Sequence, residues 1–190
     1  MTASRLVHLM RHGTPAVEGL LLGRTDAPVT DMGVAACTRR AAGIDVRHVV
    51  ASDLQRARRC ASAIAAPLGL AVMVDPRWRE LDFGDWDGCA PASIDPAALG
   101  NFYDDPDTAA PPRGERWSAL CARVADAVAA LPDEAALVVT HGGAMRAVLA
   151  TACGFDRRQV WAFDLPSAAL LSLRIWSGPQ PTVQIVGLST

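Results

Sequence analysis

Short runs of aliphatic and β-branched residues alternate along the chain with longer alanine-rich segments, and this alternation constrains the fold most strongly. Strands are expected at 6–10, 48–52, 71–75, 136–143, 168–176 and 182–188. The strand at 136–143 is expected to end in a turn. Helices are expected over 31–43, with Thr30 as N-cap, and over 53–69, 115–131 and 144–153. Strands that alternate with helices form βαβ units. The sequence therefore predicts an α/β fold: a mainly parallel sheet with helices on both faces and at least one antiparallel strand, because a short turn joins the last two strands.

The composition is that of a single globular domain. The chain has 190 residues, of which 51% are hydrophobic, enough to bury a sizeable core. A net charge of -2 speaks against a nucleic-acid partner, which normally requires a basic face. Because no apolar run suits a signal peptide or a membrane span, we expect no membrane partner and a cytoplasmic location. We expect one domain over 1–190, with 85–114 as an irregular, cap-like insertion holding one short helix near 96–103.

The spacing of the cysteines and histidines gives no sign of a metal site, and we expect neither a metal site nor a cofactor. The five cysteines lack CxxC spacing, so free thiols in a reducing compartment are expected. His8 and His12 are four residues apart on a strand, which separates them by roughly 13 Å, too far to share one ion. His8 is expected to make a hydrogen bond within the sheet, and His48 to be exposed.

All the positively charged residues are arginines, and the chain contains no lysine. This excludes lysine Schiff bases and the P-loop lysine as mechanisms. Guanidinium groups remain, and their planar forks suit carboxylate and phosphate ligands.

Three polar motifs follow expected strands: RHG at 11–13, SDLQRAR at 52–58 and THGG at 140–143. In sheets of this kind, ligands bind outside the carboxyl ends of the strands. His12 and His141 are each followed by glycine, which lets the backbone turn sharply beside the imidazole. A fourth motif, RELDFGDWDG at 79–88, adds carboxylates. These four motifs together predict one site at the edge of the sheet.

With these motifs in this order, the chain resembles the histidine phosphatase superfamily, the phosphoglycerate-mutase-like phosphatases, from Leu6 to about Gly154. The resemblance implies that His12 is the nucleophile and that Arg11 and Arg56 bind the phosphate. It further implies that Glu80 is the acid and that His141 binds the transferring phosphoryl group.

Some assignments within this resemblance have rivals. Arg58 competes with Arg56, although the arginine-alanine step favours Arg56. Asp82 and Asp85 compete with Glu80 as proton donor. Gly142 is expected to help bind the phosphate.

The expected chemistry follows from the charge of a phosphate monoester. Its dianion must be held by cations, and arginines can do this without a metal ion. The nucleophile must be a neutral imidazole, which neighbouring arginines favour by lowering the pKa of His12. A departing alkoxide needs a proton, which Glu80 beside the dianion could supply. We therefore expect a phosphomonoester hydrolase with a phosphohistidine intermediate and a small-molecule substrate.

The substrate is the least constrained prediction. The chain is short where mutases carry an insertion, which favours hydrolysis over phosphoryl transfer. The stretches 23–33 and 111–124 are similar to the α-ribazole phosphatases, so α-ribazole 5′-phosphate is the expected substrate.

Four residues are expected to bind the alcohol half of this substrate: Arg24, Thr25, Trp86 and Tyr103. The chain departs from the family pattern at Thr14-Pro15 and Arg116. Mutase-type transfer and a phosphate-binding domain without catalysis are the alternatives, and a homodimer is left open.

Overall fold

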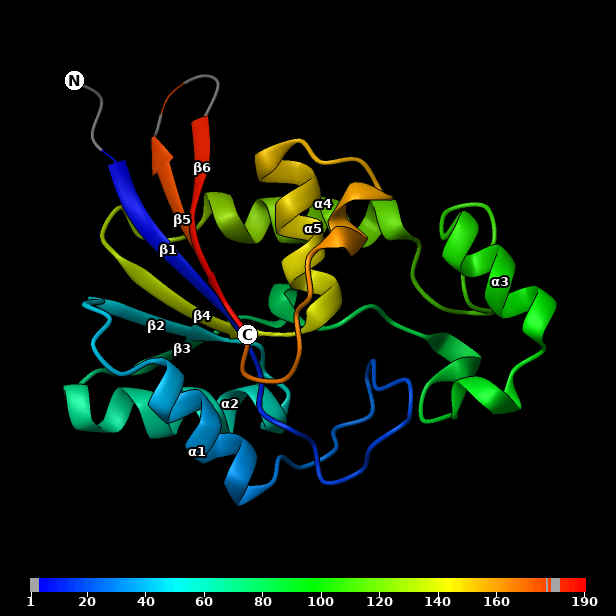
Figure 1. Ribbon diagram of the computed structural model, residues 1–190, viewed down its shortest axis with the longest axis horizontal. Helices are drawn as coiled ribbons and strands as arrows, with labels where there is room; N and C mark the ends of the chain where they lie inside the picture. Colours follow the sequence, from blue (N-terminus) through cyan, green and yellow to red (C-terminus); the bar gives the residue numbers. More distant parts are fainter. Residues whose placement is uncertain (1–3, 177, 179–181) are drawn as a thin grey trace.

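A single six-stranded sheet organises the part of the chain that the computed structural model describes, residues 4–176, 178 and 182–190. The strands are β1 (Ser4–Arg11), β2 (His48–Ala51), β3 (Val72–Val74), β4 (Ala136–Thr140), β5 (Leu170–Trp176) and β6 (Thr182–Ser189). Their order is β3-β2-β4-β1-β5-β6 (Figure 1). The first four strands in this order pair in parallel, and β5 is antiparallel to both β1 and β6. The predicted fold class is confirmed.

Helices cover both faces of the sheet (Figure 1). On one face lie α1 (Asp31–Arg40) and α2 (Gln55–Ala65), and on the other α4 (Trp117–Ala129) and α5 (Gly142–Cys153). A hydrophobic core fills the space between the sheet and each helix pair. Every residue of β4 is buried because the strand is central and covered twice. This explains why its sequence is an unbroken apolar run before Thr140 instead of an alternating pattern.

The helix ends follow local chemistry. The hydroxyl of Thr30 accepts from Gly33 N–H, which confirms Thr30 as N-cap of α1. The α-helix expected over 53–69 is shorter, because Asp53 pairs with Arg79 and a 3₁₀ turn containing Pro67 ends it. The helix α5 begins at Gly142, directly after β4, and not at Ala144 as expected.

The segment between β3 and α4 is mostly irregular. It contains three 3₁₀ turns (Pro76–Trp78, Gly84–Trp86 and Pro91–Ser93) and the helix α3 (Pro96–Asp104), close to the short helix expected there. The helix α3 lies away from the sheet, beyond its carboxyl edge (Figure 1). Phe102 on α3 is buried against the edge of Trp86, with ring centroids 5.7 Å apart, so an aromatic cluster attaches this segment to the main core.

Candidate active site

The two expected catalytic histidines lie side by side because their strands are neighbours. Arg11, the last residue of β1, is in register with Thr140, the last residue of β4. His12 and His141 therefore leave the sheet at the same point, and their ring centroids are 5.1 Å apart. Both rings are buried.

The orientation of His12 leaves one ring nitrogen free for chemistry. Its Nδ1 lies 2.7 Å from the carbonyl oxygen of Gly13, which can only accept a hydrogen bond. Nδ1 therefore carries the proton, and Nε2 carries a lone pair. Burial, with Arg56 and Arg11 adding to it, lowers the pKa of His12 to about 3. His12 is thus neutral at physiological pH, mainly through desolvation and only secondarily through the arginines expected to cause it.

Gly13 and Gly33 hold the loop after His12 against α1. A Cβ on Gly13 would overlap the backbone of Gly33, and a Cβ on Gly33 would lie 2.6 Å from Thr14 N. Thr30 N–H also donates to Thr14 O at 3.0 Å. This close backbone contact explains the glycine of RHG and fixes the direction of the chain beyond His12.

Arg56 is buried and close enough to His12 to contribute to lowering its pKa, whereas its rival Arg58 is exposed on the outer face of α2. The Arg56 guanidinium is fully buried and donates to the carbonyls of Thr25 (2.7 Å), Leu22 (2.8 Å) and Gly23 (3.0 Å). Burial lowers its pKa, although an arginine stays protonated.

Arg11 is held in a comparable way. Its Nη1 donates to Leu165 O at 2.6 Å, which leaves other guanidinium N–H groups for a ligand.

Glu80 is held by two backbone N–H groups. Its Oε2 accepts from Gly143 at 3.0 Å and its Oε1 from Leu81 at 2.9 Å. A Cβ on Gly143 would overlap Oε1, so a glycine at this position allows the carboxylate to lie against the start of α5. The earlier start of α5 is what places this N–H beside Glu80.

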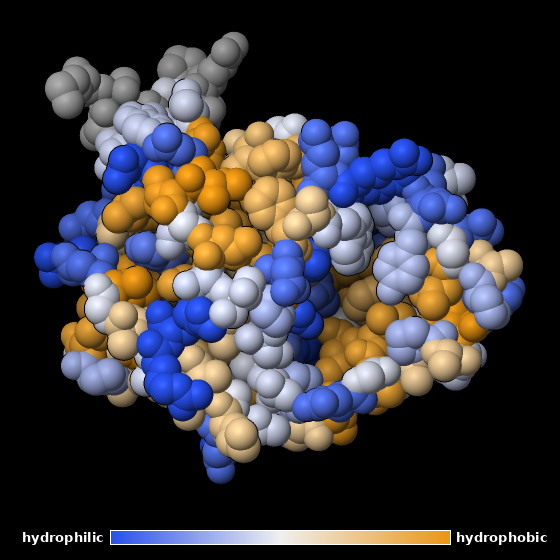
Figure 2. Space-filling model, viewed as in Figure 1, coloured by the Kyte–Doolittle hydropathy of each residue, from blue (hydrophilic) through white to orange (hydrophobic). Residues whose placement is uncertain are grey.

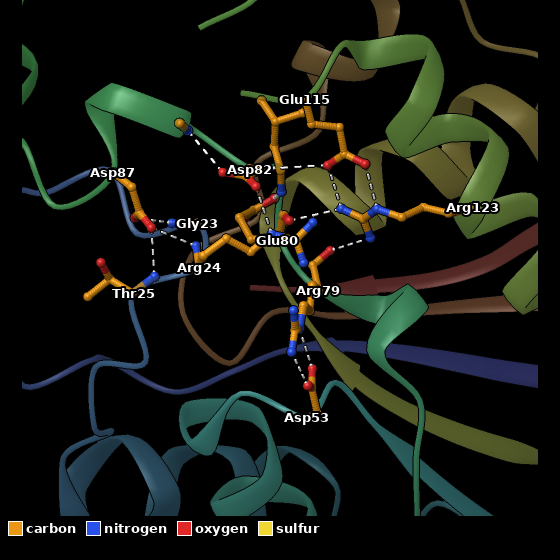
Figure 3. Close-up of polar contacts among 12 residues, drawn as sticks. Gly23, Arg24, Thr25, Asp53, Arg79, Glu80, Asp82, Asp87, Glu115 and Arg123 are labelled. Atoms are coloured by element: carbon orange, nitrogen blue, oxygen red, sulfur yellow. Dashed lines mark hydrogen bonds and ion pairs between the residues drawn. The ribbon is translucent and has the colours of Figure 1, made fainter. Parts of the chain in front are cut away.

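An ion pair between Arg123 on α4 and Glu115, just before α4, fixes the backbone around Glu80 (Figure 3). The Arg123 guanidinium donates to the carbonyls of Arg77 (2.7 Å), Arg79 (2.8 Å) and Glu80 (2.9 Å). Glu115 accepts from the same guanidinium at 2.7 and 2.8 Å and from Asp82 N–H at 3.2 Å. Arg123 therefore positions the segment that carries Glu80 without lining the cavities described below.

The rival carboxylates are engaged elsewhere. Asp82 accepts from Arg24 Nε at 3.2 Å and from Gly84 N–H at 2.9 Å. Asp85 pairs with Arg113. Neither lines the cavities beside His12, whereas Glu80 lines both.

His141 and Gly142 lie where α5 begins. Both ring nitrogens of His141 are buried and have no hydrogen-bond partner within the described residues. Burial, the neighbouring His12 and the arginines hold the pKa of His141 well below its usual range. A neutral donor with unsatisfied polarity at a helix N-terminus suits an anionic phosphoryl oxygen.

Two cavities adjoin at Arg11 and Glu80. One, of about 460 Å³, lies between His12, Glu80 and the loop over 14–22. The other, of about 290 Å³, extends toward α3. It is lined by the rings of Tyr103 and Trp161, by other apolar side chains and by Arg146. Figure 2 shows a hollow near the middle of the visible face, blue in its depth and orange along one wall. The site thus has a polar reacting end and a largely apolar distal end.

Only one of the four residues expected to bind the alcohol lines these cavities. Tyr103 does, but Trp86 packs against Phe102 instead. Arg24 pairs with Asp82 (Figure 3). The exposed Thr25 offers its carbonyl to Arg56. Trp86, Arg24 and Thr25 therefore support the site from outside the cavities.

Sequence reasoning missed three residues around the distal cavity, Arg146, Arg157 and Trp161, and one supporting residue, Asp87. The Asp87 carboxylate accepts from the N–H groups of Gly23, Arg24 and Thr25, which orders the loop that holds Arg56 (Figure 3). Arg146 had a detectable signal, because it lies one helical turn after Gly142 and therefore on the same helix face. The others depend on loop positions without such a period.

A family model described as histidine phosphatase superfamily (branch 1) matches residues 7–186. The chain belongs to this superfamily. A glucosyl-3-phosphoglycerate phosphatase of Mycobacterium tuberculosis is 33% identical over 169 residues, covering 79% of this chain and 75% of the relative. A protein named probable phosphoglycerate mutase, of Erwinia tasmaniensis, is 31% identical over 160 residues, 78% of this chain and 74% of the relative.

Solved structures agree with the family. A mycobacterial glucosyl-3-phosphoglycerate phosphatase superposes with a TM-score of 0.82 at 27% identity, covering 96% of this chain and 97% of that one. A candidate alpha-ribazole-5′-P phosphatase of Escherichia coli gives 0.82 at 22% identity, with 98% and 96% coverage, which shows the shared fold alone. With the family and the phosphatase relatives together, the chain is a phosphatase of the histidine phosphatase type.

Within the described ranges, no cluster of three or more His, Cys, Asp or Glu side chains is arranged to hold a metal ion. Across those same ranges, no helix has the length and apolar character needed to span a bilayer.

His8 and His48 lie away from the site. His8 Nδ1 is 2.8 Å from Ser172 Oγ on β5, as expected of a strand histidine with a hydrogen bond in the sheet. His48 is only partly exposed, because its Nε2 lies 3.1 Å from Glu134. The expectation that His48 is exposed is therefore confirmed only in part.

Proposed function

We propose that this phosphatase hydrolyses phosphomonoesters through a phosphohistidine on His12 Nε2, without a metal ion. The observation that carries the proposal is the hydrogen bond between His12 Nδ1 and Gly13 O, which directs the ring lone pair to Nε2. A neutral imidazole between Arg11 and His141 matches what attack on a phosphate dianion needs.

The first step transfers the phosphoryl group to the enzyme. The Nε2–P bond forms as the ester P–O bond breaks, and protonated Glu80 gives its proton to the departing alkoxide. The imidazole becomes positively charged, and Gly13 O stabilises this charge through the Nδ1 proton. In this proposal Arg11, Arg56 and the start of α5 bind the equatorial oxygens.

The second step returns the enzyme to its initial state. Ionised Glu80 takes a proton from water, whose oxygen attacks phosphorus as the N–P bond breaks. Inorganic phosphate leaves, and His12 is again neutral with its proton on Nδ1. Two backbone N–H groups, of Leu81 and Gly143, hold the Glu80 side chain in position for this step.

For the substrate, we propose from the sequence a phosphate ester of an aromatic alcohol, with α-ribazole 5′-phosphate as the example. The aromatic faces of Tyr103 and Trp161 in the distal cavity support it. The relatives above 30% identity are named for phosphoglycerate and its glucosyl derivative, and these names support an acidic alcohol instead.

The test is hydrolysis of p-nitrophenyl phosphate in EDTA by the wild-type protein and by His12→Ala. Steady release of phosphate with EDTA present is expected, with a loss on the order of 10⁴-fold or more in the variant. Quenching with labelled substrate should trap a base-stable, acid-labile adduct only in the wild-type protein.

Three outcomes count against the proposal. Near-normal turnover by His12→Ala would remove the nucleophile assignment. Binding of phosphate without turnover would favour a non-catalytic domain. Transfer of the label to an added alcohol, in place of water, would favour mutase-type chemistry.

A further inference from the structure

A tight turn just before β5 lies against the backbone of the RHG motif. Arg11 N–H donates to Ala169 O at 2.9 Å, and Ala168 N–H donates to His12 O at 3.2 Å. The Arg11 guanidinium adds its hydrogen bond to Leu165 O at 2.6 Å. The turn is thus attached to both Arg11 and His12, so its position beside the nucleophile is fixed.

The four residues from Pro166 to Ala169 form a β-turn with an unusual backbone. Ala169 N–H donates to Pro166 O at 3.0 Å, and Ala168, the third residue of the turn, has a φ of 62°. These two features are typical of a type II turn, which favours glycine at the third position. Alanine is unfavourable there because its Cβ crowds the backbone, and such a conformation is retained where neighbouring contacts hold it. Ser167, the second residue, therefore stands at the corner of this turn.

Ser167 is half-buried and lines the cavity of about 460 Å³ at the reacting end, together with Arg11, His12 and Glu80. Within the described part of the chain, its hydroxyl has no hydrogen-bond partner. A hydroxyl can donate one hydrogen bond and accept others. The Ser167 hydroxyl is therefore available to a ligand in the cavity that holds the nucleophile.

The order of the strands places Ser167 on the opposite side of His12 from His141. The strand β1, which ends beside His12, lies between β4 and β5. His141 follows β4 and Arg56 follows β2, so both approach from one side of β1, whereas Ser167 precedes β5 on the other side. A phosphoryl group in transfer carries negative charge on three equatorial oxygens that point in different directions. A donor on the β5 side can reach an oxygen that faces away from His141.

We propose that the Ser167 hydroxyl donates a hydrogen bond to an equatorial oxygen of the phosphoryl group as it moves to and from His12, which makes Ser167 a further catalytic residue. This inference rests on the proposed phosphohistidine mechanism and adds one contact to it. The hydroxyl keeps its proton, so the bonds that form and break in the two steps stay the same. Because the contact is with the phosphoryl group, it should act on every phosphomonoester alike. Thr14 also carries a hydroxyl and lines this cavity, so the experiment includes it.

The experiment measures inhibition by orthovanadate, which mimics five-coordinate phosphorus, and hydrolysis of p-nitrophenyl phosphate and glycerol 3-phosphate. The proteins compared are the wild type, Ser167→Ala, Ser167→Thr and Thr14→Val. Ser172→Ala is the matched control, because it removes a serine hydroxyl from β5 that pairs with His8 at 2.8 Å and lines neither cavity. Thermal unfolding of each variant gives the folded fraction to which the kinetic values are scaled.

Ser167→Ala is expected to weaken inhibition by orthovanadate about tenfold, the size of effect that follows from one lost hydrogen bond to a charged group. Its kcat/KM should fall by a similar factor on both esters, because the lost contact does not involve the leaving group. Ser167→Thr keeps a hydroxyl and should recover most of the loss. Ser172→Ala and Thr14→Val should resemble the wild type in both measurements.

The results separate this inference from the proposed function. If the wild-type protein hydrolyses neither ester, the proposed function fails. If it hydrolyses them and orthovanadate inhibits Ser167→Ala as strongly as the wild type, the role of Ser167 is wrong. An equal loss in Ser172→Ala would trace the effect to the packing of β5 and overturn the hydroxyl contact. A loss in Thr14→Val alone would make Thr14 the donor, and a loss in Ser167→Ala on only one of the esters would place the hydroxyl at the alcohol. Either outcome overturns the contact of Ser167 with the phosphoryl group.

Discussion

The reacting end and the distal end of this site are built from different parts of the chain. At the reacting end, His12, His141 and Arg56 are at most 5% exposed and come from strand ends and helix starts. At the distal end, Tyr103 and Trp161 are 46% and 53% exposed and lie on short helices outside the sheet. The residues proposed to carry the chemistry thus lie on the rigid scaffold, whereas the side chains at the distal end have few constraints from the core.

The two ends also differ in how their polar groups are held. Around Glu80, His12 and Arg56, hydrogen bonds to the backbone set each position. Around Arg146, the contacts are long and an aromatic ring provides most of the support. A group held by the backbone is preorganised for the transition state, whereas one held by a ring can adapt to a ligand.

The largest effect in this comparison is expected at Glu80. Glu80→Gln keeps the size of the side chain but removes the proton donor, so hydrolysis of alkyl phosphates should fall about 10²- to 10⁴-fold. The loss should be much smaller for p-nitrophenyl phosphate, because p-nitrophenolate departs with little need of a proton. Steady-state kinetics on both esters measure the difference.

An equal loss on both esters would contradict the role of Glu80 as acid. Asp82→Asn is the matched control, since Asp82 is engaged with Arg24 and lines neither cavity. A leaving-group-dependent loss in Asp82→Asn instead would make Asp82 the donor.

Arg123 should give an intermediate effect. Arg123→Met removes the hydrogen bonds to the carbonyls of Arg77, Arg79 and Glu80, which lets the acid shift. Misplacement of this kind should lower kcat on alkyl phosphates about ten- to a hundredfold. The loss should again be smaller on p-nitrophenyl phosphate, and Arg123→Lys should recover part of it.

This leaving-group dependence distinguishes positioning from general destabilisation. A variant that is merely less stable would lose activity on both esters in equal proportion. Thermal unfolding of Arg123→Met, measured beside the kinetics, shows which fraction of the protein is folded. Equal losses on both esters would remove the positioning role.

The smallest effect should appear at the distal end. Tyr103→Ala removes a half-exposed ring from the cavity and should reduce kcat/KM about three- to tenfold for substrates with large alcohols. Trp86→Ala should instead lower thermal stability, because Trp86 packs against Phe102. If Trp86→Ala changed substrate preference and Tyr103→Ala did not, Trp86 and not Tyr103 would contact the substrate at the distal end.

The sequence alone was sufficient to predict the fold class and to predict which residue types meet at the edge of the sheet. Apolar periodicity predicts strands and helices because burial follows the backbone repeat, and this is a local property. The RHG and THGG motifs meet because β1 and β4 are neighbours whose carboxyl ends share one edge. The parallel arrangement predicted from βαβ order was enough to expect that meeting.

Only the tertiary structure decided how each side chain is used. Arg56 and Arg58 look alike in sequence, but α2 buries the first and exposes the second. Trp86 and Tyr103 were equal candidates, and α3 places only the ring of Tyr103 in the cavity. Arg146 lies over the ring of Trp161, which comes from a separate turn of the chain. These outcomes depend on contacts between residues far apart in the sequence, and local patterns of hydrophobicity carry no information about them.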